Sequence, residues 1–220
     1  QLIKLLLDNS DYIDRLNPQF AGKLGQGRLN MEAAVRAAKD QLNKNQSNLL
    51  LAMVDKQAGK VWRLDKSGQV IGNFLAYDKL SSGFNVSAAD INNDDTVEIV
   101  TSPQANYKPL IRIFDQHGKL LTEWLAYDEK FRGGTQVALA DVNRDGLVEI
   151  ITAPGPGHQP EIKIFNHQGK LLNKFLVYAA GFKGGAQVAA ADLDNNGSVE
   201  IVTIPLTQGI AQVRTFDWQG

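Results

Sequence analysis

The chain contains, at residues 141–149, the stretch Asp141-Val-Asn143-Arg-Asp145-Gly-Leu147-Val-Glu149. Two further copies read Asp90-Ile-Asn92-Asn-Asp94-Asp-Thr96-Val-Glu98 and Asp192-Leu-Asp194-Asn-Asn196-Gly-Ser198-Val-Glu200. The first residues of the three copies are 51 positions apart each time. A fixed period of this size is typical of repeat architectures, in which each repeat is one supersecondary unit that needs its neighbours.

The repeat extends on both sides of the acidic stretch. It is preceded by Gly133-Gly134-Thr-Gln136-Val137 and by Gly184-Gly185-Ala-Gln187-Val188, with a looser third copy around Asn85. It is followed by β-branched runs such as Val148-Glu-Ile-Ile-Thr152 and then by alternating runs such as Glu161-Ile-Lys-Ile-Phe165. These features predict about four short strands per repeat, bounded by Gly, Asn and Asp.

The strand pattern predicts a mainly β protein. We expect three strands in residues 49–77, four in 84–127, four in 135–178 and three in 186–220. Four antiparallel strands repeated every 50 residues or so are typical of a β-propeller blade, so the chain holds about three and a half blades.

Closed propellers have about four to eight blades, and we therefore expect the chain to be a piece of a longer protein. The alternative is that two copies combine into a closed ring, and open blade edges would favour such self-association.

The first 48 residues differ from the repeats. Residues 2–8 form an apolar, helix-like run, and Asn30 is a candidate N-cap for an Ala-rich helix over 31–38. We therefore expect a short α-helical segment in residues 1–40, a polar linker at 41–48 and the repeat region at 49–220.

Composition excludes several functional classes. The chain is 43% hydrophobic and 21% charged, with a net charge of −1 and no cysteine. It is therefore neither disordered nor, having no apolar run of about 18–20 residues, membrane-spanning through a helix. The balanced charge gives no general attraction to nucleic acid, and the lack of cysteine excludes disulfides and cysteine-based zinc sites.

The acidic stretch places oxygen-bearing side chains at alternate positions, as a hard cation such as calcium requires. The alternative is a metal-free Asx-turn, in which Asp and Asn side chains cap backbone amides. Asx-turns account for one or two such residues per loop, but not for three at alternate positions plus a late Glu in three copies. The stretch is not an EF-hand, because it lacks a Glu at the twelfth position and is flanked by strands.

Residues 49–220 resemble the FG-GAP/VCBS-type repeats of bacterial surface proteins and of integrin α-subunit propellers. The resemblance is carried by the Gly-Gly-x-Gln-Val lead-in, the Asp-x-[Asn/Asp]-x-[Asp/Asn]-Gly loop and the Glu-Ile-[Val/Ile]-Thr strand. It implies that each loop joins the first two strands of a blade and holds calcium.

The ligands that this resemblance implies are the alternate residues of the three loops. They are Asp90, Asn92, Asp94, Thr96 and Glu98; Asp141, Asn143, Asp145, the carbonyl of Leu147 and Glu149; and Asp192, Asp194, Asn196, the carbonyl of Ser198 and Glu200. The first loop departs from the pattern, because Asp95 stands where Gly146 and Gly197 stand. We expect this position to need a left-handed backbone, which Asp adopts only at some cost.

Sites with two or three carboxylates on a short loop bind calcium with dissociation constants of about 10⁻⁴–10⁻³ M. Such sites fill where calcium is millimolar, and the motif therefore indicates an extracellular protein. The expected role is structural, because a cation that binds only the folded state adds stability.

The N-terminal stretch Leu5-Leu-Leu-Asp-Asn-Ser-Asp-Tyr-Ile-Asp14, with Gly25-Gln-Gly-Arg-Leu-Asn30, resembles the last part of a subtilisin-like serine peptidase domain. This implies a secreted endopeptidase as the parent protein and a catalytic triad upstream of Gln1, so we expect no catalytic residue here. Two functions follow: a non-catalytic calcium-binding module of such a peptidase, or a stand-alone adhesion or carbohydrate-binding propeller. The partner would be an extracellular protein or glycan.

Other candidate residues favour structural roles. His117 and His167 are expected in solvent-facing turns, and His158 in a loop at a blade end. Aromatic residues at equivalent positions predict packing within or between blades rather than a sugar platform. They are Phe74, Trp124 and Phe175, and Tyr77, Tyr127 and Tyr178.

Overall fold

The computed structural model of this chain describes residues 10–11, 28–29, 49–55, 58–65, 67–207 and 212–220. Before residue 49 the described residues form two short antiparallel strands, β1 (Ser10–Asp11) and β2 (Arg28–Leu29). The helices expected over 2–8 and 31–38 and the linker expected at 41–48 lie outside the described residues.

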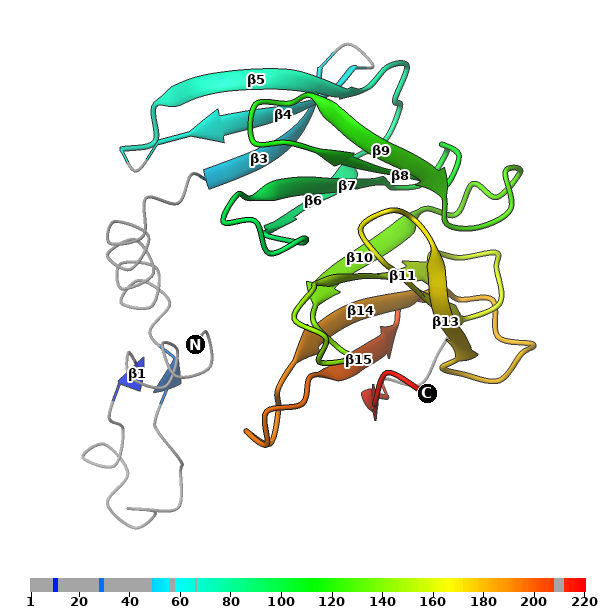
Figure 1. Ribbon diagram of the computed structural model, residues 1–220. Coiled ribbons are helices and arrows are strands. Elements are labelled where there is room, and N and C mark those ends of the chain that lie inside the picture. Colours follow the sequence, from blue (N-terminus) through cyan, green and yellow to red (C-terminus); the bar gives the residue numbers. More distant parts are fainter. Residues whose placement is uncertain (1–9, 12–27, 30–48, 56–57, 66, 208–211) are drawn as a thin grey trace. The chain divides into compact units, whose positions relative to one another are not determined.

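The described repeat region consists of four sheets and contains no helix (Figure 1). The first is β3 (Leu49–Asp55), β4 (Ala58–Leu64) and β5 (Val70–Tyr77). The second is β6 (Phe84–Ala89), β7 (Glu98–Pro103), β8 (Leu110–Phe114) and β9 (Leu120–Leu125). The third is β10 (Thr135–Ala140), β11 (Glu149–Pro154), β12 (Glu161–Phe165) and β13 (Leu171–Leu176). The fourth is β14 (Ala186–Ala191), β15 (Glu200–Pro205) and β16 (Arg214–Phe216).

The described strands confirm the expected numbers of three, four, four and three per repeat. In the second, third and fourth sheets consecutive strands pair antiparallel in the order of the sequence, as in a propeller blade. The described sheets do not close into a complete propeller. The chain divides into two compact units, residues 1–49 with 63–71 and residues 50–62 with 72–220, and the last three sheets lie wholly in the second.

Neighbouring sheets share their apolar faces. One cluster joins Val100 and Ile111 of the second sheet to Ile150 and Phe165 of the third. The next cluster joins the opposite face of the third sheet to Ile201 and its neighbours in the fourth. Every residue of β7 and of β11 is buried, so these strands lose the usual alternation of buried and exposed residues because they are covered on both sides.

A tyrosine latch joins each sheet to the next. The hydroxyl of Tyr127 lies 3.2 Å from Thr152 Oγ1 and donates to the carbonyl oxygen of Glu161 at 3.0 Å. Burial raises the pKa of Tyr127, so the hydroxyl keeps its proton at neutral pH. The same latch recurs in the repeats before and after it, as Tyr77 with Thr101 and the Leu110 carbonyl, and as Tyr178 with Thr203 and the Gln212 carbonyl.

A basic side chain of the following sheet also contacts the tyrosine across each of these junctions. Lys163 Nζ donates to the carbonyl of Ala126 at 2.9 Å and lies 4.9 Å from the centre of the Tyr127 ring. The equivalent cations are Arg112, over Tyr77 and bonded to the Ala76 carbonyl, and Arg214, over Tyr178 and bonded to the Val177 carbonyl. The expectation that the recurring tyrosines pack between blades is thus confirmed.

The recurring large aromatic residues pack beneath the turn glycines of the following repeat. Gly169 has φ 79°, and a Cβ there would lie 2.8 Å from the Trp124 ring. Gly118 and Gly220 lie over Phe74 and Phe175 in the same way. The glycine and the aromatic residue of each pair therefore depend on each other, although they belong to different repeats.

Replacement of Tyr127 by Phe removes the latch hydroxyl and keeps the ring. We expect the free energy of unfolding to fall by about 1–2 kcal/mol, because a buried hydrogen bond is lost and its acceptor stays buried. Urea unfolding followed by fluorescence would measure this. The matched control is Tyr107→Phe, whose exposed hydroxyl contacts Asp78 at 3.4 Å and should contribute less than about 0.5 kcal/mol. Equal losses in both variants would contradict the latch.

Replacement of Gly169 by Ala tests the contact with Trp124. Gly157 is the control, since it has φ 99° but no atom within 4 Å of a Cβ added there. Both variants carry the backbone cost of a left-handed alanine, about 1–2 kcal/mol. We expect Gly169→Ala to lose at least about 1 kcal/mol more in thermal melts, because overpacking adds to the backbone cost.

Candidate metal centre

Each acidic loop joins the first and second strands of its sheet, as the sequence resemblance implied. Residues 90–98 connect β6 to β7, residues 141–149 connect β10 to β11, and residues 192–200 connect β14 to β15. The final Glu of each loop is the first residue of the second strand. The three candidate sites therefore occupy equivalent places in three consecutive sheets.

The first Asp of each loop caps the loop's own backbone. In the second loop Asp141 Oδ1 accepts from the Arg144 amide at 2.7 Å, and Oδ2 accepts from the Gly146 amide at 3.0 Å. The other two loops repeat the bond to the sixth residue, from Asp95 to Asp90 Oδ2 and from Gly197 to Asp192 Oδ2, each at 2.9 Å. The third and fifth residues accept from amides two positions further on. These bonds are Asn92–Asp94, Asn143–Asp145, Asp194–Asn196, Asp94–Thr96, Asp145–Leu147 and Asn196–Ser198.

The last Glu closes the loop. Glu149 Oε2 accepts from the Val142 amide at 3.0 Å, and Glu98 and Glu200 accept from the amides of Ile91 and Leu193. Glu149 is 1% exposed, and burial is the main cause that raises the pKa of its carboxyl, while the Val142 amide opposes the rise. Hydrogen bonding by Thr96 lowers the pKa of Asp94 in the exposed part of the first loop.

The sixth residue of each loop has the left-handed backbone that the sequence predicted. Asp95 has φ 66°, Gly146 has φ 87° and Gly197 has φ 84°. The fourth residue is left-handed as well, with φ between 58° and 65° at Asn93, Arg144 and Asn195. The sequence did not predict this second left-handed position, because no glycine marks it.

The second loop has a neutral amide among its acids. Asn143 Nδ2 donates to Asp145 Oδ2 at 3.0 Å and to Glu149 Oε1 at 3.1 Å. The amide group thus partly compensates two carboxylates from within the loop. In the first loop Asn92 Nδ2 donates to Asp94 Oδ2 at 2.9 Å, and the Thr96 hydroxyl bridges Asp94 and Glu98.

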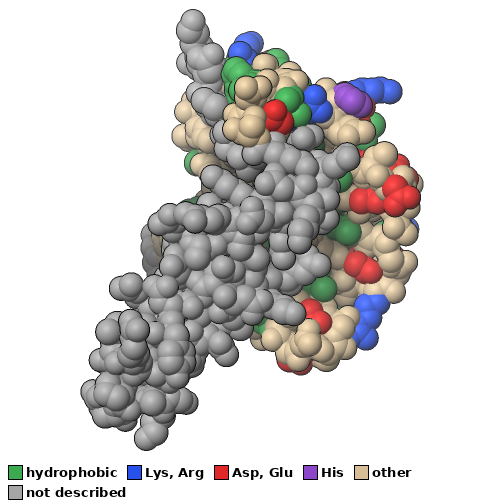
Figure 2. All heavy atoms as spheres, turned by 90° about the vertical axis from the view of Figure 1, so that its left-hand side faces the viewer, with side chains coloured by type: hydrophobic (Ala, Val, Ile, Leu, Met, Phe, Trp, Pro, Cys, Tyr) green, Lys and Arg blue, Asp and Glu red, His purple; other side chains and the backbone are tan. Residues whose placement is uncertain are grey.

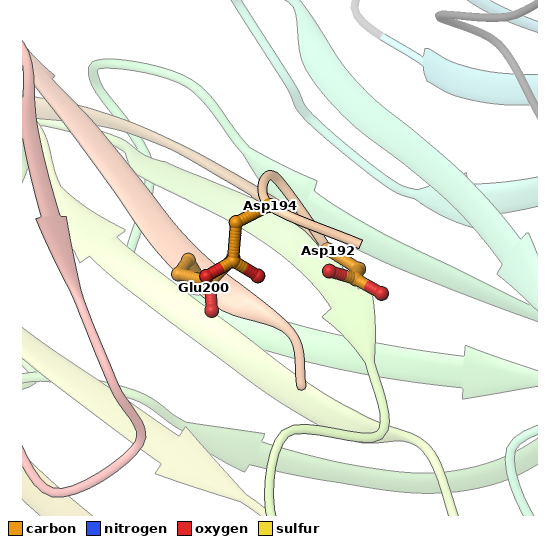
Figure 3. A group of neighbouring side chains, drawn as sticks. All are labelled: Asp192, Asp194 and Glu200. Carbon is orange, nitrogen blue, oxygen red and sulfur yellow. The ribbon is translucent and has the colours of Figure 1, made fainter. Parts of the chain in front are cut away.

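The third loop has an acid where the others have that amide. Asp194 takes the place of Asn92 and Asn143, and an ionised carboxylate cannot donate a hydrogen bond. The amide of this loop is at the fifth position, where Asn196 Nδ2 donates to Asp194 Oδ2 at 2.9 Å. One carboxylate oxygen from each of Asp192, Asp194 and Glu200 lies within 4.8 Å of the others, and Figure 3 shows Asp194 and Glu200 directed toward one another. Within the described ranges this is the only group of three His, Cys, Asp or Glu side chains that is close enough to share a metal ion.

No basic side chain of the described residues neutralises this group. The ion pairs found there are Arg112–Glu123 and the pairs of Lys163 and Lys174 with Glu161, all outside the acidic loops. On the face of the described residues in Figure 2, acidic and basic side chains are scattered and form no continuous basic stripe. Three like charges within 4.8 Å repel one another, so a bound cation would stabilise them.

The histidines are placed largely as expected. His117 is exposed in the β8–β9 turn, as expected, whereas His167 is half-buried with a buried Nδ1, so the expected solvent-facing position is wrong for His167. His158, in the β11–β12 loop, lies against Tyr127 and Phe131 with ring centres 4.9 Å and 5.2 Å away. No described helix is long and apolar enough to cross a membrane.

Comparison with known proteins supports the repeat assignment. The FG-GAP-like repeat family matches residues 141–203, which include the second and third acidic loops. A comparison with curated proteins finds no match.

Among solved structures, the chain is similar to the V. cholerae biofilm matrix protein Bap1, with 22% sequence identity and a TM-score of 0.46. The alignment covers 72% of this chain and 25% of that protein, so the chain spans about a quarter of its length.

Exchanging the residues at the sixth position of the first and second loops tests the backbone argument. Asp95→Gly should stabilise the chain by about 0.5–1 kcal/mol, because glycine adopts φ 66° freely. Gly146→Asp should destabilise it by a similar amount, and there the cost is from the backbone alone, since no atom lies within 4 Å of an added Cβ. Thermal melts in EDTA would measure both, and equal signs for the two changes would contradict the argument.

Proposed function

We propose that this chain is a non-catalytic, calcium-binding FG-GAP-type repeat module that works outside the cell in attachment to a protein or glycan. The observation that carries the proposal is the third acidic loop. There Asp192, Asp194 and Glu200 bring three carboxylates within 4.8 Å, with no basic partner among the described residues.

Calcium suits this site better than other common metals. The donors are all carboxylate, amide, hydroxyl and backbone oxygens, which hard cations prefer. The chain has no cysteine, and its three histidines lie outside the loops, so a zinc or copper site of the usual type is not formed there. The ligands that we propose in the third loop are Asp192, Asp194, Asn196, Glu200 and the carbonyl of Ser198.

The metal-free loop is already shaped by its own hydrogen bonds. In the third loop Oε1 of Glu200 has no donor among the described residues, and Asp192 and Asp194 lie beside it. A cation could therefore bind without first breaking the hydrogen bonds from backbone amides that hold the loop. In each of the second and third loops one asparagine amide would have to turn its oxygen toward the metal. The nitrogen of Asn143 now faces Asp145 and Glu149, and that of Asn196 faces Asp194.

The role we propose for the metal is structural. The loop connects the first two strands of a sheet, and its second residue packs against the next sheet in the first two copies. A cation that binds only the folded chain adds stability in proportion to the logarithm of its concentration. Loops with two or three carboxylates fill at about millimolar calcium, a concentration that is typical of the extracellular space.

The attachment of this module to a secreted subtilisin-like peptidase is a further part of the proposal. It rests on the resemblance of residues 1–40 alone. The alternative is a stand-alone adhesion or carbohydrate-binding protein. Sequencing of the gene upstream of Gln1 decides between them, since a Gly-Thr-Ser nucleophile motif within a few tens of residues would favour the peptidase.

Reciprocal substitutions at the third position of two loops test calcium binding. Asp194→Asn gives the third loop the side chain of the second, and Asn143→Asp does the reverse. We expect calorimetric titration to show about tenfold weaker calcium binding for Asp194→Asn and stronger binding for Asn143→Asp, because affinity follows the number of charged ligands. In EDTA, Asn143→Asp should also melt lower, because the amide donor is lost.

The control is Asp78→Asn, which removes an exposed acid outside the loops and should leave calcium binding unchanged. Melting temperatures with and without millimolar calcium provide a second measurement. If calcium produces neither heat nor a rise in melting temperature in the wild-type chain, the loops are metal-free Asx-turns and the proposal fails.

A further inference from the structure

The third acidic loop contains a reactive dipeptide in addition to its candidate ligands. Asn196 is followed by Gly197, and this is the only Asn-Gly pair in the chain. The backbone nitrogen after an asparagine can attack the carbonyl carbon of that asparagine's side chain and close a succinimide ring. Glycine favours this closure, because it has no side chain to crowd the approach and its backbone turns freely.

The nitrogen that would attack already donates to a carboxylate. The amide of Gly197 donates to Asp192 Oδ2 at 2.9 Å. The nitrogen has to lose this proton as it forms the new bond. A carboxylate at hydrogen-bond distance is placed to accept the proton, so Asp192 can act as the general base.

The side-chain carbonyl of Asn196 accepts a hydrogen bond from the opposite partner of the turn. The Ser198 amide donates to Asn196 Oδ1 at 2.7 Å. Negative charge develops on this oxygen when a nitrogen attacks the carbonyl carbon, and an N–H group that is already directed at the oxygen stabilises that charge. The same bond keeps the side chain folded back over its own backbone, which lowers the entropy cost of ring closure.

Water has free access to the dipeptide. Asn196 and Gly197 are both exposed, and no atom lies within 4 Å of a Cβ added at Gly197. The second loop makes the same kind of turn without the glycine. Asn143 Oδ1 accepts from the Asp145 amide at 2.9 Å, but the residue after Asn143 is Arg144. The second loop is therefore an internal comparison for the third.

We propose that the third loop promotes its own deamidation at Asn196. The Gly197 nitrogen forms a bond to Cγ of Asn196 while Asp192 accepts the N–H proton. The bond from Cγ to Nδ2 then breaks, and Nδ2 leaves as ammonia with that proton, relayed by solvent. Water opens the succinimide at either carbonyl and leaves aspartate or isoaspartate at position 196. One water is consumed and one ammonia is released for each chain.

Deamidation changes the charge and the pattern of the loop. Aspartate at position 196 gives the third loop the acid that Asp94 and Asp145 supply to the other two, whereas isoaspartate adds a methylene group to the main chain. The inference rests on hydrogen bonds of the metal-free loop and does not depend on calcium binding. Because the Asn196 oxygen is one of the proposed calcium ligands, the experiment is carried out in EDTA.

Peptide mapping by mass spectrometry follows the reaction in the whole chain at neutral pH, since each deamidation adds about 1 Da. The reference is a synthetic peptide of residues 187–205, which has the same dipeptide without the folded turn. We expect Asn196 to react at least about tenfold faster in the folded chain than in the peptide, because a placed base accelerates proton transfer. Asn143 should stay intact. A rate in the folded chain equal to or below that of the peptide would overturn the proposal.

Two variants test the role of the neighbouring groups. Asp192→Asn keeps an oxygen that can accept from Gly197 but removes the base, so its rate should fall to that of the peptide. Asp78→Asn is the control, because it removes an exposed acid outside the loops and should leave the rate unchanged. An Asp192→Asn chain that is folded by circular dichroism and reacts as fast as the wild type would contradict the proposal.

Arg144→Gly transfers the dipeptide to the second loop and does not depend on the folding of the Asp192 variant. The amide of Arg144 donates to Asp141 Oδ1 at 2.7 Å, as that of Gly197 does to Asp192. Arg144 has φ 65°, which glycine adopts freely. We expect Asn143 to become a second site of deamidation in this variant. If Asn143 stays intact there, the turn does not promote the reaction and the proposal fails.

Discussion

The sharing of apolar faces between consecutive sheets is the constraint on which the rest of this structure depends. A four-stranded sheet of this composition has two apolar faces, and β7 and β11 are buried along their whole length only because sheets lie on both sides. Polar groups support the same junctions. The Tyr127 latch and the reach of Lys163 to the Ala126 carbonyl both cross from one repeat to the next.

The acidic loops are candidate metal sites, and they also take part in the contacts between consecutive sheets. The amide of Val148, in the second loop, donates to the carbonyl of Ile91 in the first at 3.3 Å. The Ile91 side chain is buried with residues of the third sheet. The geometry of one loop is therefore coupled to the packing of the next sheet, and a cation that stiffens the loop would also stiffen the junction.

The sequence predicted the number of strands in each repeat and the place of each loop, because β-branched runs and Gly, Asn and Asp boundaries are local signals. It also predicted the left-handed backbone at Asp95, because Gly stands at that position in the other copies.

The left-handed Arg144 and the latch were not predicted. The signal for the latch was present, since a tyrosine recurs at or just after the last strand of the first three repeats and a cation recurs in the third strand of the last three. Its meaning depends on contacts between repeats, which spacing along the chain does not specify. The consequence of having Asn or Asp at the third position of a loop was not predicted either. Both residues offer an oxygen ligand, but Asn can also donate a hydrogen bond, whereas an ionised Asp only accepts.

The candidate site with the most clustered acids is the one that neighbouring sheets cover least. Glu98 and Glu149 are 3% and 1% exposed, whereas Glu200 is half-buried and the adjacent Leu193 is 47% exposed. Burying an ionised carboxylate without a partner is costly, and in the second loop the Asn143 amide donates to the buried Glu149 and offsets part of this cost. Solvent lowers the cost in the third loop, where the Asn196 amide donates to Asp194 and, among the described residues, Glu200 Oε2 accepts only from the Leu193 amide. The third loop is covered least by neighbouring sheets, and its clustered carboxylates are therefore the ones that a bound cation would stabilise most.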